Sequence, residues 1–192
     1  ANVPDAITTI AKARVSTNET NASINVNDES NSTYRIIGTV DITEPNTAVT
    51  LYVNDTTKYI NWTSNGTVTP VDIIYSVNNG GTWYDIQRNY TATTGDNVYN
   101  WNPIPDRKNE SSCLVKIIHN KTGMTDINNT TAAFSIFPVI NVTKPTSGEN
   151  LFAGSSNATV NWTYTGTQLA NVDILLYNNT SQWQYITTTS VG

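Results

Sequence analysis

The chain repeats itself at a spacing of about 100 residues, and this internal repeat constrains its fold more than any other feature. Asn61-Trp62-Thr63 returns as Asn161-Trp162-Thr163. Val71-Asp72-Ile73 returns as Val172-Asp173-Ile174. A repeat of this length corresponds to one β-sandwich domain. The 192 residues therefore predict tandem copies of one domain.

Strand signals fill the best-defined copy of the repeat, which spans residues 38–137. Apolar and polar residues alternate in residues 59–63, so Ile60 and Trp62 are expected on one face of a strand. Residues 78–81, Asn-Asn-Gly-Gly, predict a hairpin turn because Asn and Gly tolerate a positive φ angle. Seven short strands at this spacing predict an all-β fold of tandem immunoglobulin-like β-sandwiches. We expect Trp62, Trp101 and Trp162 to pack in their cores.

The two ends of the chain match only parts of the repeat. Residues 1–37 resemble the closing strands of a domain, although Ala6–Val15 also has the composition of a short helix; here the repeat favours strands. Residues 138–192 match the opening strands and lack a counterpart of residues 93–101. We therefore expect one complete domain at 38–137, with the closing strands of an incomplete domain at 1–37 and the opening strands of another at 138–192.

N-glycosylation acceptors of the form N-x-[ST] are far more frequent than chance predicts. The chain has 27 Asn and 46 Ser or Thr, which predict about 6 acceptors, whereas 16 occur. This excess predicts a heavily N-glycosylated, extracellular protein of archaeal or eukaryotic origin. The candidate sites are Asn18, Asn21, Asn31, Asn54, Asn61, Asn65, Asn89, Asn109, Asn120, Asn128, Asn129, Asn141, Asn157, Asn161, Asn178 and Asn179.

Composition excludes several classes of partner. The formal net charge is −5 and the pI is about 4.6, so the chain has no basic footprint for nucleic acid and little attraction for an anionic membrane. No apolar run approaches the roughly 18 residues of a membrane span. The sequence has no starting Met and no signal-peptide pattern, so we expect it to be processed or an excerpt of a longer chain.

Residues that carry catalytic or metal chemistry are scarce. Cys113 and His119 are the only residues of their kinds, and a predicted strand separates them by about 20 Å, too far for direct proton transfer. We expect Cys113 at a small buried core position and His119 at the surface. Asp72 and Asp173 recur at one strand position, and Asp72 is expected on the solvent side of its strand. No carboxylates form a calcium loop, so we expect no enzyme activity, metal or cofactor.

Trp83 and Tyr84 follow the predicted hairpin turn and leave two interpretations open. The rings either pack against the domain or form an exposed strip that stacks on sugar rings, because aromatic side chains combine an apolar face with a polar edge. The second interpretation makes the chain an adhesin or carbohydrate-binding module.

Seven short motifs mark the repeat, and they are Pro145-Thr-Ser-Gly148-Glu149, Ile60-Asn-Trp62, Val71-Asp-Ile-Ile-Tyr75-Ser76, Gly80-Gly81-Thr-Trp83, Tyr99-Asn-Trp101-Asn-Pro103, Cys113-Leu-Val115-Lys116-Ile117 and Phe134-Ser-Ile136. Together they resemble an extracellular immunoglobulin-like repeat family found in large bacterial and archaeal surface proteins, and more distantly the Ser/Thr-rich cell-wall proteins of fungi. The first copy departs at residues 45–48, which lack the Gly-Glu pair. The resemblance implies the fold over nearly the whole chain and says little about function, because such domains serve as spacers, adhesins and wall components.

The partial domains at the two ends predict a structural role, as the building block of a surface filament, fibre or S-layer-like array. Residues 1–37 of a neighbouring copy would complete residues 138–192 by strand complementation, and this head-to-tail contact grows without closing. Such fibres resemble archaeal thread-like filaments and bacterial pili assembled by donor strands. The alternative is a covalent array of which this chain is an excerpt, and the missing counterpart of residues 93–101 slightly favours it.

Overall fold

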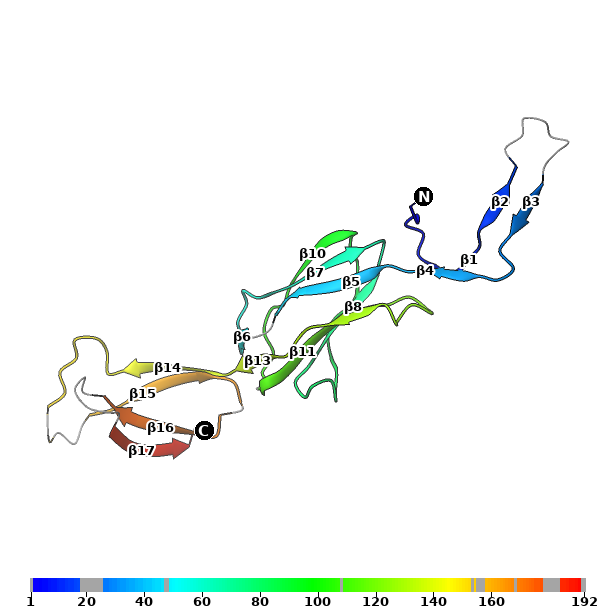
Figure 1. The fold of residues 1–192 in the computed structure, drawn as a ribbon. Coiled ribbons are helices and arrows are strands. Elements are labelled where there is room, and N and C mark those ends of the chain that lie inside the picture. The colour runs from blue at the N-terminus through cyan, green and yellow to red at the C-terminus, as the bar shows by residue number, and fades with distance from the viewer. Residues whose placement is uncertain are drawn as a thin grey trace.

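The computed structural model describes residues 2–17, 26–46, 49–107, 109–152, 154, 158–167, 169–177 and 184–190, and the side chains of residues 109–111 are not considered. Every regular element in these ranges is a β-strand (Figure 1). The strands form three successive groups along an elongated molecule. The prediction of an all-β fold built from β-sandwich domains is confirmed.

The middle group is a two-sheet sandwich, here called the central sandwich (β5–β13). Its first sheet has the order β10-β7-β5 and contains β5 (Thr39–Glu44), β7 (Tyr59–Asn65) and β10 (Gly95–Asn100). Its second sheet has the order β6-β13-β11-β8-β9 and contains β6 (Thr50–Tyr52), β8 (Val71–Ser76), β9 (Tyr84–Tyr90), β11 (Asn109–His119) and β13 (Phe134–Phe137), with β12 (Asn128–Thr130) paired to β11. This division of the strands between two sheets is that of an immunoglobulin-like sandwich.

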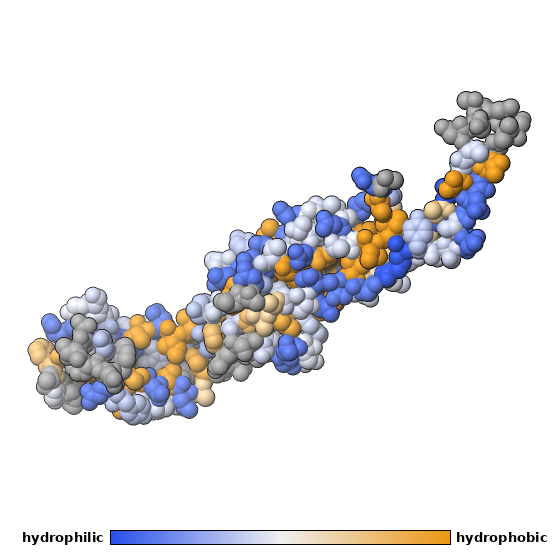
Figure 2. All heavy atoms as spheres, in the orientation of Figure 1, coloured by the Kyte–Doolittle hydropathy of each residue, from blue (hydrophilic) through white to orange (hydrophobic). Residues whose placement is uncertain are grey.

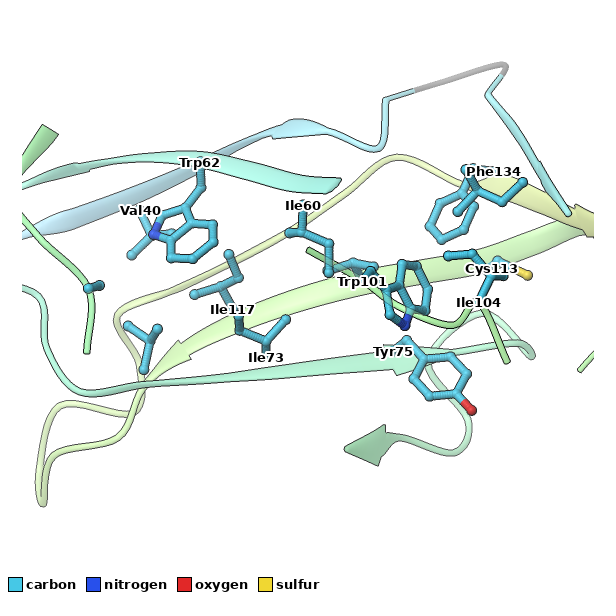
Figure 3. Packing of buried hydrophobic residues seen from close by; sticks show 14 of the residues in the cluster. Val40, Ile60, Trp62, Ile73, Tyr75, Trp101, Ile104, Cys113, Ile117 and Phe134 are labelled. Carbon is cyan, nitrogen blue, oxygen red and sulfur yellow. The ribbon is translucent and has the colours of Figure 1, made fainter. Parts of the chain in front are cut away.

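The core of the central sandwich lies between these sheets (Figure 3). Ile60 and Trp62 of β7 are 0% and 1% exposed, because the period of two in a strand places both on the inner face. The Trp101 ring packs 5.5 Å from the ring of Tyr75 and 6.3 Å from that of Phe134. Burying each large apolar side chain contributes about 1.5–3 kcal/mol. The predicted core positions of Trp62 and Trp101 are confirmed.

Cys113 is completely buried, as predicted for a small core position, and burial raises the pKa of its thiol to about 11. The expectation for His119 is wrong, because its side chain is also completely buried. The segment that follows β11 folds back over this end of the strand, and the His119 backbone N–H donates to the Ile127 carbonyl at 2.9 Å. The expectation for Asp72 is wrong too, since it is 7% exposed.

The N-terminal group is a long hairpin, here called the N-terminal hairpin (β1–β4). β1 (Thr8–Ala11) pairs with β4 (Tyr34–Ile36), and β2 (Arg14–Ser16) pairs with β3 (Asn27–Glu29). The Arg14 guanidinium and the Glu29 carboxylate form an ion pair across β2 and β3. Strands, rather than a helix, therefore occupy this part of the chain.

The C-terminal group consists of two separate strand pairs, here called the C-terminal unit (β14–β17). β14 (Val139–Lys144) pairs with β15 (Asn161–Thr165), and β16 (Asn171–Leu176) pairs with β17 (Gln184–Ser190). The β14–β15 register repeats the β5–β7 register, because Val142 lies opposite Trp162 as Ile42 lies opposite Trp62. The sequence repeat is thus a structural repeat. Within the described residues, no helix is long and apolar enough to cross a membrane.

Candidate functional site

The C-terminal unit leaves open the face that the central sandwich buries. A groove of about 1090 Å³ runs between its two strand pairs. Its lining is mostly apolar and includes Ile140, Val142, Trp162, Val172, Ile174 and Ile186. Apolar side chains gather on this unit in Figure 2. The groove is therefore lined by the kind of apolar residues that form the core of the central sandwich, but it is open to solvent.

Equivalent positions of the two repeats differ sharply in exposure. Val40 is 6% exposed and its counterpart Ile140 is 46% exposed. Leu51 is 3% exposed and its counterpart Leu151 is 52% exposed. In the central sandwich β13 pairs alongside Leu51, and the described part of the C-terminal unit has no strand at the matching place. The absence of a strand equivalent to β13 among the described residues explains why Leu151 is exposed.

One backbone edge of the C-terminal unit is also open. β8 pairs with β9 on one side and β11 on the other, whereas β16 pairs with β17 alone among the described residues. An open edge beside an apolar face is a ready template for another strand. The unit thus presents both backbone hydrogen-bonding groups and an apolar surface to a partner.

The N-terminal hairpin exposes the complementary kind of surface. Val15 is 78% exposed, whereas Ile117, its counterpart in the repeat, is completely buried in the central sandwich. Val3, Ile10 and Val26 are likewise exposed on this segment. A two-stranded hairpin has no core of its own and is marginal in water without something to pack against.

The hairpin is attached to the central sandwich by a polar joint. The Thr67 backbone N–H donates to Asp5 Oδ1 at 2.8 Å and the Thr67 hydroxyl donates to Asp5 Oδ2 at 2.7 Å. These two bonds lower the pKa of the Asp5 carboxyl. Gly66 has a φ of +80°, and a Cβ there would lie 3.0 Å from Asp5 Oδ1. The turn therefore approaches Asp5 as closely as only glycine permits.

A similar joint, made by a backbone N–H, lies between the central sandwich and the C-terminal unit. The Thr167 backbone N–H donates to Asp106 Oδ1 at 3.0 Å and to Oδ2 at 2.8 Å, and Gly166 has a φ of +108°. Sequence reasoning missed these contacts, although Val3-Pro4-Asp5 and Ile104-Pro105-Asp106 match in the repeat. The pattern that could have predicted the joints is the return of Gly66-Thr67 as Gly166-Thr167 in the repeat.

The first joint has further contacts that the second does not copy. Arg35 of the hairpin forms a bidentate ion pair with Asp126, and each of its two nitrogen–oxygen distances is 2.7 Å. The Lys121 ammonium donates to the Ile7 carbonyl at 3.3 Å. Ser135 stands where the repeat places Arg35, so this ion pair belongs to the first joint alone.

Asp72 lies at the centre of a polar cluster on β8. It accepts hydrogen bonds from Arg88 at 2.6 Å, the Asn89 backbone N–H at 2.9 Å and the Asn120 amide at 3.1 Å. Burial opposes ionisation, but these donors outweigh it and lower the pKa of the Asp72 carboxyl. Asp173 at the matching position is exposed and accepts from the Thr188 hydroxyl. The described residues contain no cluster of three metal-ligating side chains.

The two candidate sugar-stacking rings do not form a common surface. Tyr84 lies opposite Tyr75 in the sheet and packs toward the core, with the Arg107 guanidinium 3.9 Å from its ring centroid. Trp83 instead lies 5.6 Å from the Lys116 ammonium, and Lys116 pairs with Ile74 on the opposite face of the sheet from Tyr75. Both rings are half-buried. The arrangement favours packing for Tyr84 and places Trp83 beside Lys116 instead.

The candidate glycosylation sites fall into three groups. Asn31, Asn54, Asn65, Asn141 and Asn161 are exposed, and the Asn65 amide also donates to the Thr39 hydroxyl oxygen at 3.1 Å. The Asn61 and Asn129 side chains are half-buried, and the amides of Asn89, Asn120 and Asn128 are held in hydrogen bonds. Asn18, Asn21, Asn157, Asn178 and Asn179 lie outside the described residues, as does the side chain of Asn109.

His119 gives the central sandwich a pH dependence. Its Nε2 lies 3.2 Å from the Thr69 carbonyl oxygen, and burial lowers the pKa of the imidazole below 6.5. The neutral form is therefore the stable one in the fold, and its stabilisation is complete above pH 6.5 and is lost as the pH falls below that value. The slope cannot exceed about 1.4 kcal/mol per pH unit for one proton.

Urea unfolding of the wild type and of His119→Gln at pH 7.5, 6.5 and 5.5 measures this loss. We expect the free energy of unfolding of the wild type to fall more steeply than that of the variant over this range. Parallel pH profiles would show that His119 does not titrate differently in the folded and unfolded chain. Because the chain has one histidine, its NMR titration gives an independent value.

Comparison with known proteins adds little to this description. No protein-family model matches the chain, and no curated protein matches it significantly. A solved structure of fibronectin(III)-like modules of CbhA from Clostridium thermocellum is similar over 79% of this chain and 74% of that chain, with 14% identity and a TM-score of 0.25. The immunoglobulin-like class assigned here rests on the sheets of the central sandwich.

Proposed function

We propose that this chain is a structural, extracellular glycoprotein that forms the building block of a surface filament, fibre or S-layer-like array. Neighbouring copies join head to tail by strand complementation between their incomplete domains, at residues 1–37 and 138–192. One observation carries the proposal: surfaces that the central sandwich buries are exposed at both ends of the molecule. Exposed apolar surface of this kind marks an interaction site.

The two exposed surfaces differ, and this favours an open assembly. One is a groove between strand pairs and the other is a hairpin, so each copy offers one surface of each kind. A contact between unlike surfaces is heterologous and propagates unless its rotation closes a ring. Figure 1 shows the C-terminal unit and the N-terminal hairpin, which carry these surfaces, at opposite ends of the molecule, and this suits linear growth.

The surface chemistry supports an extracellular location. Sixteen acceptors for N-glycans occur, and several of them are exposed. Attached sugars would hydrate the rod and cover strand edges that otherwise promote aggregation. The role needs no metal, cofactor or catalytic group.

Electron microscopy of native material, beside the denatured mass of its subunit, tests the proposal. We expect filaments that dissociate, without cleavage of peptide bonds, into short glycosylated subunits. A single very large polypeptide would assign the structural role to a covalent array instead of strand exchange. Monodisperse globules would contradict the structural role.

Glycopeptide mapping tests the glycan assignment with a matched pair of sites. We expect occupancy at Asn161 and none at Asn61, the same position of the repeat. The Asn61 side chain is half-buried with its Oδ1 enclosed, whereas Asn161 is exposed because no counterpart of β10 pairs with β15 in the described residues.

Asn120 and Asn128 are expected to stay unmodified. Both amide nitrogens donate to oxygen atoms of the protein, from Asn120 to Asp72 Oδ1 and from Asn128 to the Thr125 carbonyl at 3.1 Å each. Each nitrogen donates two hydrogen bonds, and a sugar would replace one of its two hydrogen atoms and so remove one of these bonds. An intact mass equal to that of the bare polypeptide would remove the glycoprotein assignment altogether.

A further inference from the structure

The central sandwich shows what fills the groove when a domain is complete. Its residues 104–137 supply β11, which pairs with β8, and β13, which pairs with β6. Val115 and Ile117 of β11 and Ile136 of β13 are completely buried by this arrangement. The C-terminal unit contains the counterpart of β8, which is β16, and the residues that correspond to β6, and it lacks both covering strands in the residues that the structure describes.

The N-terminal hairpin has the side-chain pattern of these covering strands. Ala11, Ala13 and Val15 fall where Cys113, Val115 and Ile117 fall in the repeat. Tyr34 and Ile36 fall where Phe134 and Ile136 fall. In both segments a strand from the first part pairs antiparallel with one from the second part, as β1 with β4 and β11 with β13.

The hairpin cannot reach the groove of its own chain in this structure. The Asp5–Thr67 bonds and the Arg35–Asp126 ion pair hold it against the end of the central sandwich that is remote from the C-terminal unit (Figure 1). The chain therefore carries an open groove and a hairpin with the matching side-chain pattern, and it holds the two apart. A second copy of the chain can supply the hairpin that fills this groove.

We propose that the N-terminal hairpin of a second copy fills the groove of the C-terminal unit in the strand register of the central sandwich. This inference rests on the proposed function and specifies its interface. Ile117 lies opposite Ile73 and Val115 opposite Tyr75 in the complete sandwich. The corresponding register places Val15 of the second copy opposite Ile174, and Ala13 opposite Leu176.

The second covering strand fixes another part of the interface. β13 pairs with β6 in parallel, with Ile136 opposite Leu51. The same arrangement places Ile36 of the second copy opposite Leu151, which is half-exposed in the open unit. Residues 150–152 are not a strand here and become one on docking, because pairing supplies their missing backbone partners.

The C-terminal unit of the first copy and the N-terminal hairpin of the second copy together form a composite domain. This composite domain has an Asp–Thr joint at each end. Asp106 and Thr167 of the first copy hold one end, and Asp5 and Thr67 of the second copy hold the other. Because the two joints share an Asp–Thr pairing and each lies within one chain, successive sandwiches follow one another through similar contacts. The filament therefore gains two sandwiches in a continuous row for each copy of residues 1–192.

Cross-linking of the full chain tests the register. A chain with both Val15→Cys and Ile174→Cys, treated with a short thiol-specific cross-linker, is expected to give a ladder of covalent multimers in a denaturing gel. Each single variant is expected to give no ladder, and this also controls for Cys113, which is completely buried. The pair Ser16→Cys and Ile174→Cys is the register control, because Ser16 points to the opposite face of its strand.

A charge substitution tests whether the hairpin is the insert. Val15→Asp leaves the single chain folded, because Val15 is 78% exposed there, and buries a carboxylate in the composite domain. We expect the sedimentable filament fraction to fall by at least about tenfold. Ser32→Asp is the matched control, since its counterpart Ala132 is exposed in the complete sandwich and the acceptor at Asn31 is retained.

The outcomes separate this inference from the proposed function. Filaments that persist with Val15→Asp, or that give no ladder with the Val15–Ile174 cysteine pair, overturn the inference and leave the structural role standing. A ladder from the Ser16 pair instead of the Val15 pair overturns the register. Wild-type chains that form neither filaments nor multimers overturn both.

Discussion

Replacing Trp62 by alanine is expected to lower the free energy of unfolding of the central sandwich by about 3–5 kcal/mol. Trp62 is 1% exposed, and its ring packs edge-on against that of Tyr90 at 5.5 Å. The loss combines the transfer free energy of the indole with the cavity that it leaves, because neighbouring strands cannot collapse fully into a space of this size. Urea unfolding of the unassembled full chain, followed by circular dichroism, measures it.

Trp162→Ala is the matched control for this prediction. Trp162 occupies the same position of the repeat but is half-exposed in the open groove, so in the unassembled chain we expect a loss of about 1 kcal/mol. Its effect is expected to appear in filament formation instead. Equal losses for the two variants in the unassembled chain would show that the groove is already filled.

Replacing Asp72 by alanine is expected to cost about 2–3 kcal/mol, the second-largest effect. The substitution leaves the Asn89 backbone N–H without its acceptor, removes one of the two acceptors of the Asn120 amide, and removes one ion-pair partner of Arg88. Arg88 is half-exposed and keeps its ion pair with Asp85, so its positive charge still has a carboxylate partner. The cost therefore comes mainly from the two uncharged donors.

Asp173→Ala tests the same position in the C-terminal unit. Asp173 is exposed, and its contact in the structure is with the Thr188 hydroxyl, so the free energy of unfolding is expected to change by less than about 0.5 kcal/mol. Denaturant unfolding of both variants at pH 7 measures the difference. A cost for Asp173→Ala that matched the cost for Asp72→Ala would show that the polar cluster around Asp72 is not its source.

Much of the fold was predictable because periodicity and turn chemistry are local properties. Alternation predicted the inward side chains of β7, and the Asn-Gly turn predicted the β8–β9 hairpin. The repeat overrode helix propensity in residues 6–15, where β1 and β2 form. These features depend on neighbours within a few residues, or on a match between two segments of one sequence.

The errors and omissions concern contacts between distant segments. His119 was expected at the surface because it ends a strand, but the loop that buries it arrives from residues 120–127. Asp72 was expected in solvent because it alternates with core residues, but Arg88 and Asn120 enclose its carboxylate. Alternation gives the face on which a side chain lies and says nothing about what covers that face.

The sequence by itself determined the sandwich fold, the length of its repeat and the incomplete match at each end, because each follows from patterns along the chain. Only the tertiary structure decided which apolar residues remain exposed and where the joints form. Trp62 and Trp162 have the same neighbours in sequence, yet one is buried and the other lies in an open groove. The difference arises because burial depends on strands far away in the chain, and the strands that would cover Trp162 are not placed beside it.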